Sequence, residues 1–293
     1  MGDLPGLIPP EAAIIFNNTR VIKARLLGHK TSGGKVELLL IRPLKEGYLC
    51  QIRGKVHEGV RLLFGPDLQA EVIARHDNGD RVVRFLEKDQ TIDFDRLLWF
   101  LEAIGHVPLP PYIRREDTDQ DAQDYQTRFA SQPGSVAAPT ASLHFSDELL
   151  ETVRRDHPWA ELTLHVGLGT YKGVESEDIR HHTMHSERYH IGPQATALIQ
   201  SDRPLLAVGT TACRSIEHYA RTACATGECD LFLHPGNPPQ RVNHLMTNFH
   251  LPKSTLIMLV ASFVGLKKTQ ALYAEAIKER YRFYSYGDGM LII

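Results

Sequence analysis

Polar side chains that can hold or activate a substrate gather in five short segments of this sequence. The first, Asn17-Asn18-Thr19-Arg20, follows the apolar run from Ala12 to Phe16. An arginine can hold a carboxylate or a phosphate through paired hydrogen bonds, and asparagine and threonine can orient it. The alternative is a turn at a domain junction, with Arg20 in a structural ion pair. The candidates of this segment are Asn17, Thr19 and Arg20.

The second segment runs from Gly134 to Phe145 and reads GSVAAPTASLHF. Small residues allow the backbone to approach a ligand closely, and the segment then supplies a hydroxyl and an imidazole. The alternative is a tight loop whose histidine is satisfied by the backbone. The candidates here are Pro139, Thr140 and His144.

The third segment, Leu162 to Thr170, places a histidine at the end of a predicted strand and before a Gly-x-Gly turn. Imidazole titrates near neutral pH, so this histidine is suited to be a base that faces a ligand. A bare Gly-x-Gly is weak evidence for a nucleotide loop. The acidic residue and fuller glycine set of a methyltransferase are absent. The candidates are His165, Gly167, Gly169 and Thr170.

The last two segments each precede a predicted helix. Val208 to Arg214 combines a strand, a Gly-Thr-Thr turn and a helix N-terminus, which is a natural anion site, although simple N-capping explains the same residues. Thr247 to Thr255 sets polar side chains just before a very apolar helix, and burying them is costly unless they are used. The candidates are Thr210, Thr211, Arg214, Asn248, His250, Lys253 and Ser254.

A metal site is the main competing interpretation of the histidines. The segment from His181 to Glu187 offers imidazoles and a carboxylate, but it lacks the His-Glu-x-x-His order. Cys224 and Cys229 lack the spacing of a zinc ribbon. Fifteen histidines make chance clusters common, so we predict no metal ligand. His185 and Glu187 remain candidates for catalysis and substrate binding.

Composition narrows the class of protein. The 293 residues carry a net charge of −2, so any contact with RNA must come from a local patch rather than from the overall field. Such a patch could be formed by Lys267, Lys268, Lys278, Arg280 and Arg282. No apolar run of about 18 residues and no secretory signal are present, and four cysteines occur without a CxxC pair. We therefore expect a cytoplasmic protein without a membrane segment.

The elements that position these segments follow from the local pattern. A short buried strand at residues 12–16 precedes a β-rich stretch from residue 21 to about 97, in which Asn78-Gly79 is a strong hairpin signal. A proline-rich connector at 105–112 leads into alternating strands and helices. We predict strands at 162–166, 205–208, 231–233 and 290–293, and helices at 146–155, 213–225, 254–264 and 270–282. The α/β domain then comprises 1–20 and 111–293, and a small antiparallel β-barrel at 21–110 is inserted in it.

These segments, in this order, resemble the S-adenosylmethionine:tRNA ribosyltransferase-isomerases of queuosine synthesis. The matching stretches are FNNTRVIKARL (16–26), GGKVELLL (33–40), GHVPLPPYI (105–113), YQTRFA (125–130), GSVAAPTASLHF (134–145), LTLHVGLGTY (162–171), HTMHSE (182–187), VGTTACRSIE (208–217), LMTNFHLPKSTLIMLVASFVG (245–265) and YRFYSYGDGMLI (281–292). The resemblance implies an α/β-barrel-like catalytic domain with an inserted small β-barrel.

The resemblance also implies a reaction. The ribosyl part of S-adenosylmethionine is transferred to 7-aminomethyl-7-deazaguanine at the wobble position of a tRNA with a GUN anticodon. It is isomerised to an epoxy-cyclopentane, which gives epoxyqueuosine-tRNA and releases adenine and methionine. S-adenosylmethionine is thus a substrate, no cofactor is expected, and the chain is expected to act as a monomer.

The reaction needs a base, and His165 or His250 is our first choice, followed by His144 and His185. Asp288 could orient one of these histidines. Arg20, Arg214 or Lys253 could hold a carboxylate or an RNA phosphate. The remaining candidates would fix the sugar and base edges or line the site: Asn17, Thr19, Pro139, Thr140, Gly167, Gly169, Thr170, Glu187, Thr210, Thr211, Asn248, Ser254 and Tyr286.

The sequence departs from the family pattern at several positions. They are Asn18, Ser142, Leu168 and Cys213. Most members also carry a further N-terminal stretch of some tens of residues. Two alternatives therefore stay open: a transferase retuned for another nucleotide, and a paralogue that binds tRNA without turnover. Release of free adenine from S-adenosylmethionine would separate them from the main interpretation.

Overall fold

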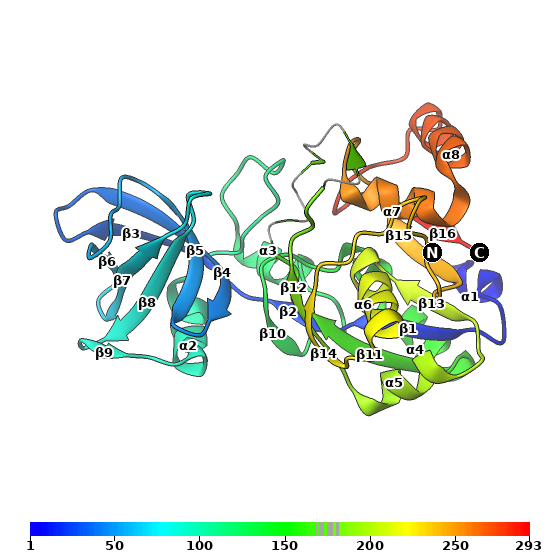
Figure 1. Ribbon diagram of the computed structural model, residues 1–293, viewed down its shortest axis with the longest axis horizontal. Coiled ribbons are helices and arrows are strands. Elements are labelled where there is room, and N and C mark those ends of the chain that lie inside the picture. Colours follow the sequence, from blue (N-terminus) through cyan, green and yellow to red (C-terminus); the bar gives the residue numbers. More distant parts are fainter. Residues whose placement is uncertain (168, 170–172, 175–177, 180–181) are drawn as a thin grey trace. The chain divides into compact units, whose positions relative to one another are not determined.

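The computed structural model describes residues 1–293 except 168, 170–172, 175–177 and 180–181 (Figure 1). The chain forms two compact units. Met1–Arg20 and Asp124–Ile293 make up one, which we call the sheet unit, and Val21–Gln123 make up the other, the barrel unit. The sequence prediction placed the second boundary between residues 110 and 111, whereas the compact units divide between Gln123 and Asp124.

The barrel unit is built from short antiparallel strands. They are β3 (Arg25–Lys30), β4 (Lys35–Leu44), β5 (Gly47–Arg53), β6 (Arg61–Phe64), β7 (Leu68–Arg75), β8 (Arg81–Glu87) and β9 (Gln90–Thr91). The order β5-β4-β3-β6-β7-β8 is closed by a further pairing of β5 with β8, so that six strands form a barrel. The short strand β9 pairs with β8 as well. The predicted inserted antiparallel barrel is confirmed.

Local signals explain the turns and the helix of this unit. Alternate residues of β7, Leu68, Ala70 and Val72, are buried, as a strand with one face toward a core requires. Asn78 stabilises its predicted hairpin because its side-chain oxygen accepts a hydrogen bond from the Asp80 amide at 3.0 Å. The unit also contains α2 (Phe94–Ile104), and α3 (Asp119–Asp124) lies at its boundary.

The sheet unit contains one mixed sheet in its described residues, of seven strands in the order β14-β12-β11-β1-β13-β15-β16. The strands are β1 (Ala13–Asn17), β11 (Trp159–Leu164), β12 (Glu187–Ile191), β13 (Leu205–Val208), β14 (Thr226–Cys229), β15 (His244–Asn248) and β16 (Gly289–Ile292). The four central strands β11, β1, β13 and β15 are parallel. The outer pairings, β11–β12, β12–β14 and β15–β16, are antiparallel.

The central strand β1 serves two hydrophobic cores, one on each face of the sheet. Ala13 and Ile15 belong to one core, and Ile14 and Phe16 belong to the other. Successive side chains of a strand point to opposite faces, so a strand that is covered on both sides is apolar throughout. This explains why the run from Ala12 to Phe16 shows no alternation of polar and apolar residues.

Helices and short segments complete the sheet unit. They are α1 (Leu4–Leu7), β2 (Thr19–Val21), β10 (Gln132–Ser135), the 3-10 helix η1 (Thr140–His144), α4 (Asp147–Asp156), α5 (Pro193–Gln200), α6 (Thr210–Thr222), α7 (Thr255–Val264) and α8 (Leu266–Lys278). The strand β2 spans the first unit boundary and pairs with β10. In the described helices, none alone is long and apolar enough to cross a membrane, and the pair α7 and α8, bent by 114°, passes that test only by length and composition.

Several predicted elements are confirmed, and one is wrong. Ser146 and Ser254 cap α4 and α7, since their hydroxyls accept hydrogen bonds from the Leu149 and Ile257 amides at 3.2 and 3.3 Å. The strand predicted at 231–233 does not form. The chain pairs with β12 earlier, through β14, and then leaves the sheet, with the carbonyl of Leu231 bound to a side chain instead.

Candidate active site

The carboxyl ends of the four parallel strands bring polar residues to one edge of the sheet. β1 ends at Asn17, β11 is followed by His165, β13 is followed by Gly209 and Thr210, and β15 ends at Asn248. Ligands of open α/β sheets bind outside this edge, because the loops and helix N-termini there present free polar groups. Three of the segments that the sequence singled out, at residues 17–20, 162–170 and 208–214, are linked there by hydrogen bonds.

Asn17 holds three elements together at the centre of this edge. Its Oδ1 accepts hydrogen bonds from the amides of Leu164 (3.0 Å) and Thr19 (3.2 Å). Its Nδ2 donates to the Leu164 carbonyl (3.0 Å) and to Oγ1 of Thr211 (3.1 Å). The residue is fully buried, and these four contacts use its side-chain amide completely. Asn17 therefore positions β11 and the start of α6 rather than offering groups to a ligand.

His165 is fixed from two sides. Its Nδ1 lies 2.9 Å from Oγ1 of Thr19, and Gly134 packs against its ring. A Cβ atom added at Gly134 would lie 2.9 Å from Cε1 of the imidazole, and the φ of +145° at Gly134 also favours glycine. Burial, and secondarily the charge of Arg188, lower the pKa of His165 to about 4. The imidazole is therefore neutral at pH 7.

A buried ion pair fixes the turn that follows His165. Glu187, at the start of β12, accepts a hydrogen bond from the Gly167 amide at 2.8 Å and also binds Nη1 of Arg214. Arg214 donates further to the carbonyls of Leu231 and Cys229, each at 3.0 Å. Burial opposes the charge of Arg214, but Glu187, together with Cys229 and Asp230, outweighs it and the pKa of Arg214 is raised. These partners show a structural use for both residues that the sequence did not reveal.

The N-terminus of α6 faces the same edge. Gly209 precedes the helix with φ of +93°, a conformation that favours glycine, and no side chain caps the helix. The amides of the first helical turn lack intrahelical partners by geometry. Thr210 and Thr211 are both buried. A helix start of this kind attracts an anion because free N–H groups and the helix dipole act together.

Two buried polar atoms at the end of β15 lack hydrogen-bond partners. Nε2 of His144 and Oδ1 of Asn248 each lack a hydrogen bond of ordinary geometry among the described residues, although the Asn248 side chain lies close enough to His144 to raise its pKa. Burial lowers the pKa of His144, whereas the Asn248 side chain and the charge of Asp288 act in the opposite direction. An unpaired buried acceptor or imidazole nitrogen costs about 1–3 kcal/mol. A ligand with complementary polar groups would remove that cost.

Asp288 contacts its own loop instead of His165 or His250. Its carboxylate accepts hydrogen bonds from the amide of Arg282 at 2.7 Å and from Nη2 of the same residue at 2.9 Å. These hydrogen bonds lower the pKa of Asp288. Its charge acts on His144, so the expectation that Asp288 orients one of the candidate histidines stays a prediction for His144.

His250 is held within the protein. Its Nε2 lies 2.7 Å from Oγ1 of Thr247, and its backbone amide donates to the hydroxyl of Tyr273 at 3.1 Å. Burial lowers the pKa of His250 to about 4. Tyr273 was missed by the sequence interpretation, since it lies in α8, 23 residues away, and carries no local signal.

The remaining candidates differ in exposure. His185, Arg20 and Lys253 are exposed, as is Tyr286, whose ring centroid lies 5.8 Å from that of Tyr125. Thr140 and Pro139 lie at the start of η1, and Gly169 contacts the His185 ring.

Thr170 and His181, together with the departure at Leu168, lie outside the described residues. In the described part of the chain, no group of three or more His, Cys, Asp or Glu residues is placed to hold a metal ion.

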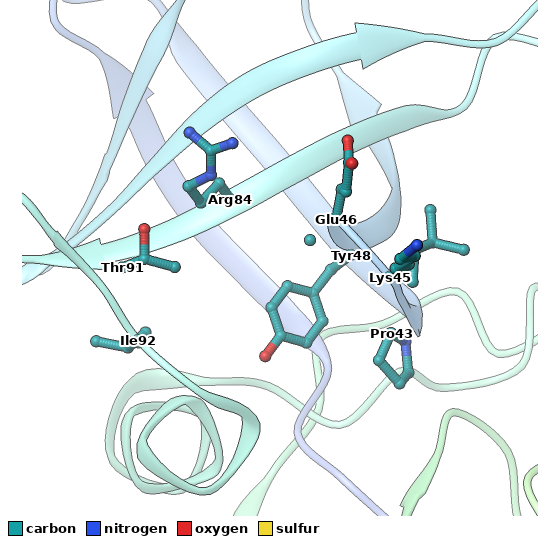
Figure 2. A pocket seen from close by; sticks show the side chains of 9 residues that line it. Pro43, Lys45, Glu46, Tyr48, Arg84, Thr91 and Ile92 are labelled. Carbon is teal, nitrogen blue, oxygen red and sulfur yellow. The ribbon is translucent and has the colours of Figure 1, made fainter.

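A pocket of about 330 Å³ lies in the barrel unit (Figure 2). It is lined by Pro43, Leu44, Lys45, Glu46, Gly47, Tyr48, Arg84, Thr91 and Ile92. None of the candidate residues lines it. The chemistry is better placed at the carboxyl edge of the sheet, where strand ends, a helix N-terminus and buried histidines meet.

A unit with polar groups at the carboxyl edge of its parallel strands, and with an inserted antiparallel barrel, belongs to the α/β class of folds, with a candidate active site at that edge. The family model described as "Queuosine biosynthesis protein" matches residues 1–292. The chain belongs to this family.

Similar proteins agree with this family. An S-adenosylmethionine:tRNA ribosyltransferase-isomerase of Campylobacter jejuni is 55% identical over 288 residues, which are 97% of this chain and 84% of that protein. One of Aliarcobacter butzleri is 55% identical over 292 residues, covering 99% and 86%. The crystal structure of an S-adenosylmethionine tRNA ribosyltransferase from Thermotoga maritima matches with a TM-score of 0.51 and 31% identity, over 99% of this chain and 86% of that one.

Proposed function

We propose that this chain transfers the ribosyl moiety of S-adenosylmethionine to 7-aminomethyl-7-deazaguanine at the tRNA wobble position and isomerises it. The products are epoxyqueuosine-tRNA, adenine and methionine. The observation that carries this proposal is 55% identity, over 97% of the chain, to a protein named for that transfer and isomerisation. S-adenosylmethionine is consumed as a substrate, and the chain's own side chains supply the remaining chemistry without a cofactor.

A neutral histidine accepts the proton in this reaction. The reaction needs a base that removes a proton beside the positively charged sulfur, and a low pKa keeps His165 unprotonated at pH 7. If Nδ1 of His165 donates to Thr19, Nε2 carries the free lone pair. His144 is the second candidate, since its buried Nε2 is unpaired and the charge of Asp288 favours its protonated form. His250 ranks below both because Thr247 occupies its Nε2.

Substrate binding uses the groups that the fold leaves available. The amides at the start of α6, with Thr210, suit the methionine carboxylate or an RNA phosphate. Oδ1 of Asn248 suits a donor on the sugar or a base. Arg20 and Lys253 are both exposed, and they are our candidates for contact with the RNA backbone. Asn17, Glu187 and Arg214 hold these groups in position through their internal hydrogen bonds.

The finer features of the proposal follow from the same family. We propose that the tRNA carries a GUN anticodon, that the chain acts as a monomer and that it works in the cytoplasm. Sedimentation of the purified protein with and without tRNA would test the monomeric state, and a panel of tRNAs with other anticodons would test the anticodon.

The deciding experiment is release of free adenine from S-adenosylmethionine, measured with a tRNA that carries the aminomethyl-deazaguanine and with the unmodified tRNA. Adenine that appears only with the modified tRNA, together with stoichiometric methionine, supports the proposal. Absence of adenine with the modified tRNA, from protein that still binds that tRNA, would overturn it. His165→Gln and His144→Gln in the same assay identify the base, because loss of turnover is expected for the residue that accepts the proton.

A further inference from the structure

Three tyrosines stand out on the surface of the sheet unit. Tyr281, Tyr284 and Tyr286 are 48%, 41% and 42% exposed. In the part of the chain that the structure describes, every other tyrosine is buried or half-buried. They occupy alternate or nearby positions in residues 281–288, which we call the tyrosine loop. Exposed aromatic rings this close together in sequence offer a surface on which a partner can stack.

Hydrogen bonds within the tyrosine loop define its conformation. At its base, the Arg282 amide donates to the Asp288 carboxylate and the Asp288 amide donates to the Arg282 carbonyl, each at 2.7 Å. Within the loop, the Gly287 amide donates to the Tyr284 carbonyl at 3.1 Å. Tyr284 has φ of +77°, a conformation that is uncommon for a residue with a bulky side chain. Such backbone conformations persist where the surroundings hold them, and they occur preferentially at functional positions.

Hydrogen bonds connect the tyrosine loop to Asn248 of the candidate site. Nδ2 of Asn248 donates to the carbonyls of Tyr284 (3.1 Å) and Ser285 (3.3 Å). The Phe249 amide also donates to the Asp288 carbonyl at 3.2 Å, and the Phe249 carbonyl accepts from the Tyr284 amide at 3.0 Å. The same Asn248 leaves its Oδ1 buried and unpaired. A single side chain thus joins the tyrosines to the point where a ligand's polar group would bind.

Two exposed arginines are neighbours of the tyrosines in the sequence. Arg280 precedes the loop, is exposed and forms no ion pair with the carboxylates in the described residues. The Arg282 side chain is 77% exposed, although one of its nitrogens contacts Asp288. Since the whole chain has a net charge of −2, a contact with a polyanion needs a local cationic patch of this kind.

We propose that the tyrosine loop is a stacking surface for unpaired nucleotide bases of the tRNA substrate, with Arg280 and Arg282 contacting the adjacent phosphates. This inference rests on the proposed function. Aromatic faces accept any base, because every base has a π face, and arginines hold the backbone that links the bases. The surface lies next to Asn248, so stacked neighbours would guide the modified base into the site.

The test compares Tyr284→Leu/Tyr286→Leu with Tyr284→Phe/Tyr286→Phe. Leucine keeps apolar bulk but removes the ring, whereas phenylalanine removes only the hydroxyl. Tyr281 is left intact because its ring contacts Phe249, with centroids 5.5 Å apart. The Tyr286 ring also contacts Tyr125, at 5.8 Å, so Tyr284→Leu alone is measured beside the double variant. Leu272→Ala, a 38% exposed apolar position of α8, is the matched control. The full-length variants are first compared by thermal unfolding, and the two single leucine variants replace the double one if it does not fold.

The Kd for the modified tRNA is measured in solution without turnover, so its outcome is separate from that of the adenine assay. The leucine variant should weaken binding by about tenfold or more, since one base–aromatic stack accounts for a change of that order. The phenylalanine variant and Leu272→Ala should bind like the wild type. An unpaired RNA loop should compete with the tRNA, and a perfect RNA duplex should not.

Two results would overturn the stacking surface. One is an unchanged Kd for the leucine variant, and the other is an equal loss for the phenylalanine variant, which would assign the effect to hydroxyls. If the wild type binds tRNA through these rings but releases no adenine, the stacking surface stands and the proposed function fails.

Discussion

At the scale of the residue, Glu187 and Arg214 show how a buried charge pair can hold a turn rather than a ligand. Glu187 accepts from the Gly167 amide, and Arg214 reaches the carbonyls of Leu231 and Cys229. Both side chains are less than a tenth exposed. Removing one charge from such a pair leaves the other buried and uncompensated, which is far more costly than losing a surface pair.

We expect Glu187→Gln to lower the free energy of unfolding by about 3–5 kcal/mol, because Arg214 would keep its charge without a carboxylate. Urea unfolding followed by circular dichroism measures the change. Glu275→Gln, which removes the partner of Lys278 in an exposed pair, should change it by less than about 1 kcal/mol. Equal effects of the two substitutions would contradict the structural part assigned to Glu187.

The pH dependence of stability should reflect the buried histidines. The pKa values of His165 and His250 are about 4, below the ordinary value of 6.5. Between these values the unfolded chain binds more protons than the folded one, so the stability present above pH 6.5 is lost as the pH falls toward 4.

We therefore expect the free energy of unfolding to drop steadily from about pH 6.5 to 4. Above that range these two histidines should contribute no pH dependence, because they are neutral in both the folded and the unfolded chain. His250→Gln should be destabilised at pH 8 through lost packing but should lose less on going to pH 5 than the wild type. Chemical denaturation at pH 8, 6 and 5 measures both. A variant that loses as much as the wild type would show that folding does not lower the pKa of His250.

At the scale of the element, the strand ends and β10 together place His165. Gly134 of β10 lies directly against the imidazole, and a methyl group there would meet the ring at 2.9 Å. We expect Gly134→Ala to displace His165 and to reduce adenine release by at least about tenfold, with a smaller effect on the fold. Gly33→Ala is the control, since it shares a positive φ but a Cβ there meets nothing within 4 Å. Full turnover by Gly134→Ala would argue against His165 in the chemistry.

The same scale shows what local sequence can and cannot predict. The apolar run of β1 and the serine caps of α4 and α7 depend on neighbouring residues, and all three were predicted. The strand expected at 231–233 was wrong because pairing with β12 selects the more polar β14 at Thr226–Cys229. The bond from Asn17 to Thr211 spans 194 positions and depends on strand order. Local patterns therefore marked the site's segments but not which side chains hold one another.

At the scale of the whole molecule, each unit carries one of the two tryptophans. Trp99 lies on α2 of the barrel unit, and Trp159 begins β11 of the sheet unit. Units with separate cores need not unfold together. We expect the fluorescence of Trp99→Phe and Trp159→Phe to give different urea midpoints. Coincident midpoints would show instead that the two units unfold as one cooperative structure.

The position of β1 at the centre of the sheet has a consequence for synthesis on the ribosome. Ala13 of this strand pairs with Leu205, which is synthesised about 190 residues later. At 5–20 residues per second the strand waits about 10–40 s for that neighbour. The barrel between them has short-range pairings and is complete much sooner. A fully apolar strand is thus exposed during translation, and binding of a nascent-chain chaperone to residues 12–17 would protect it.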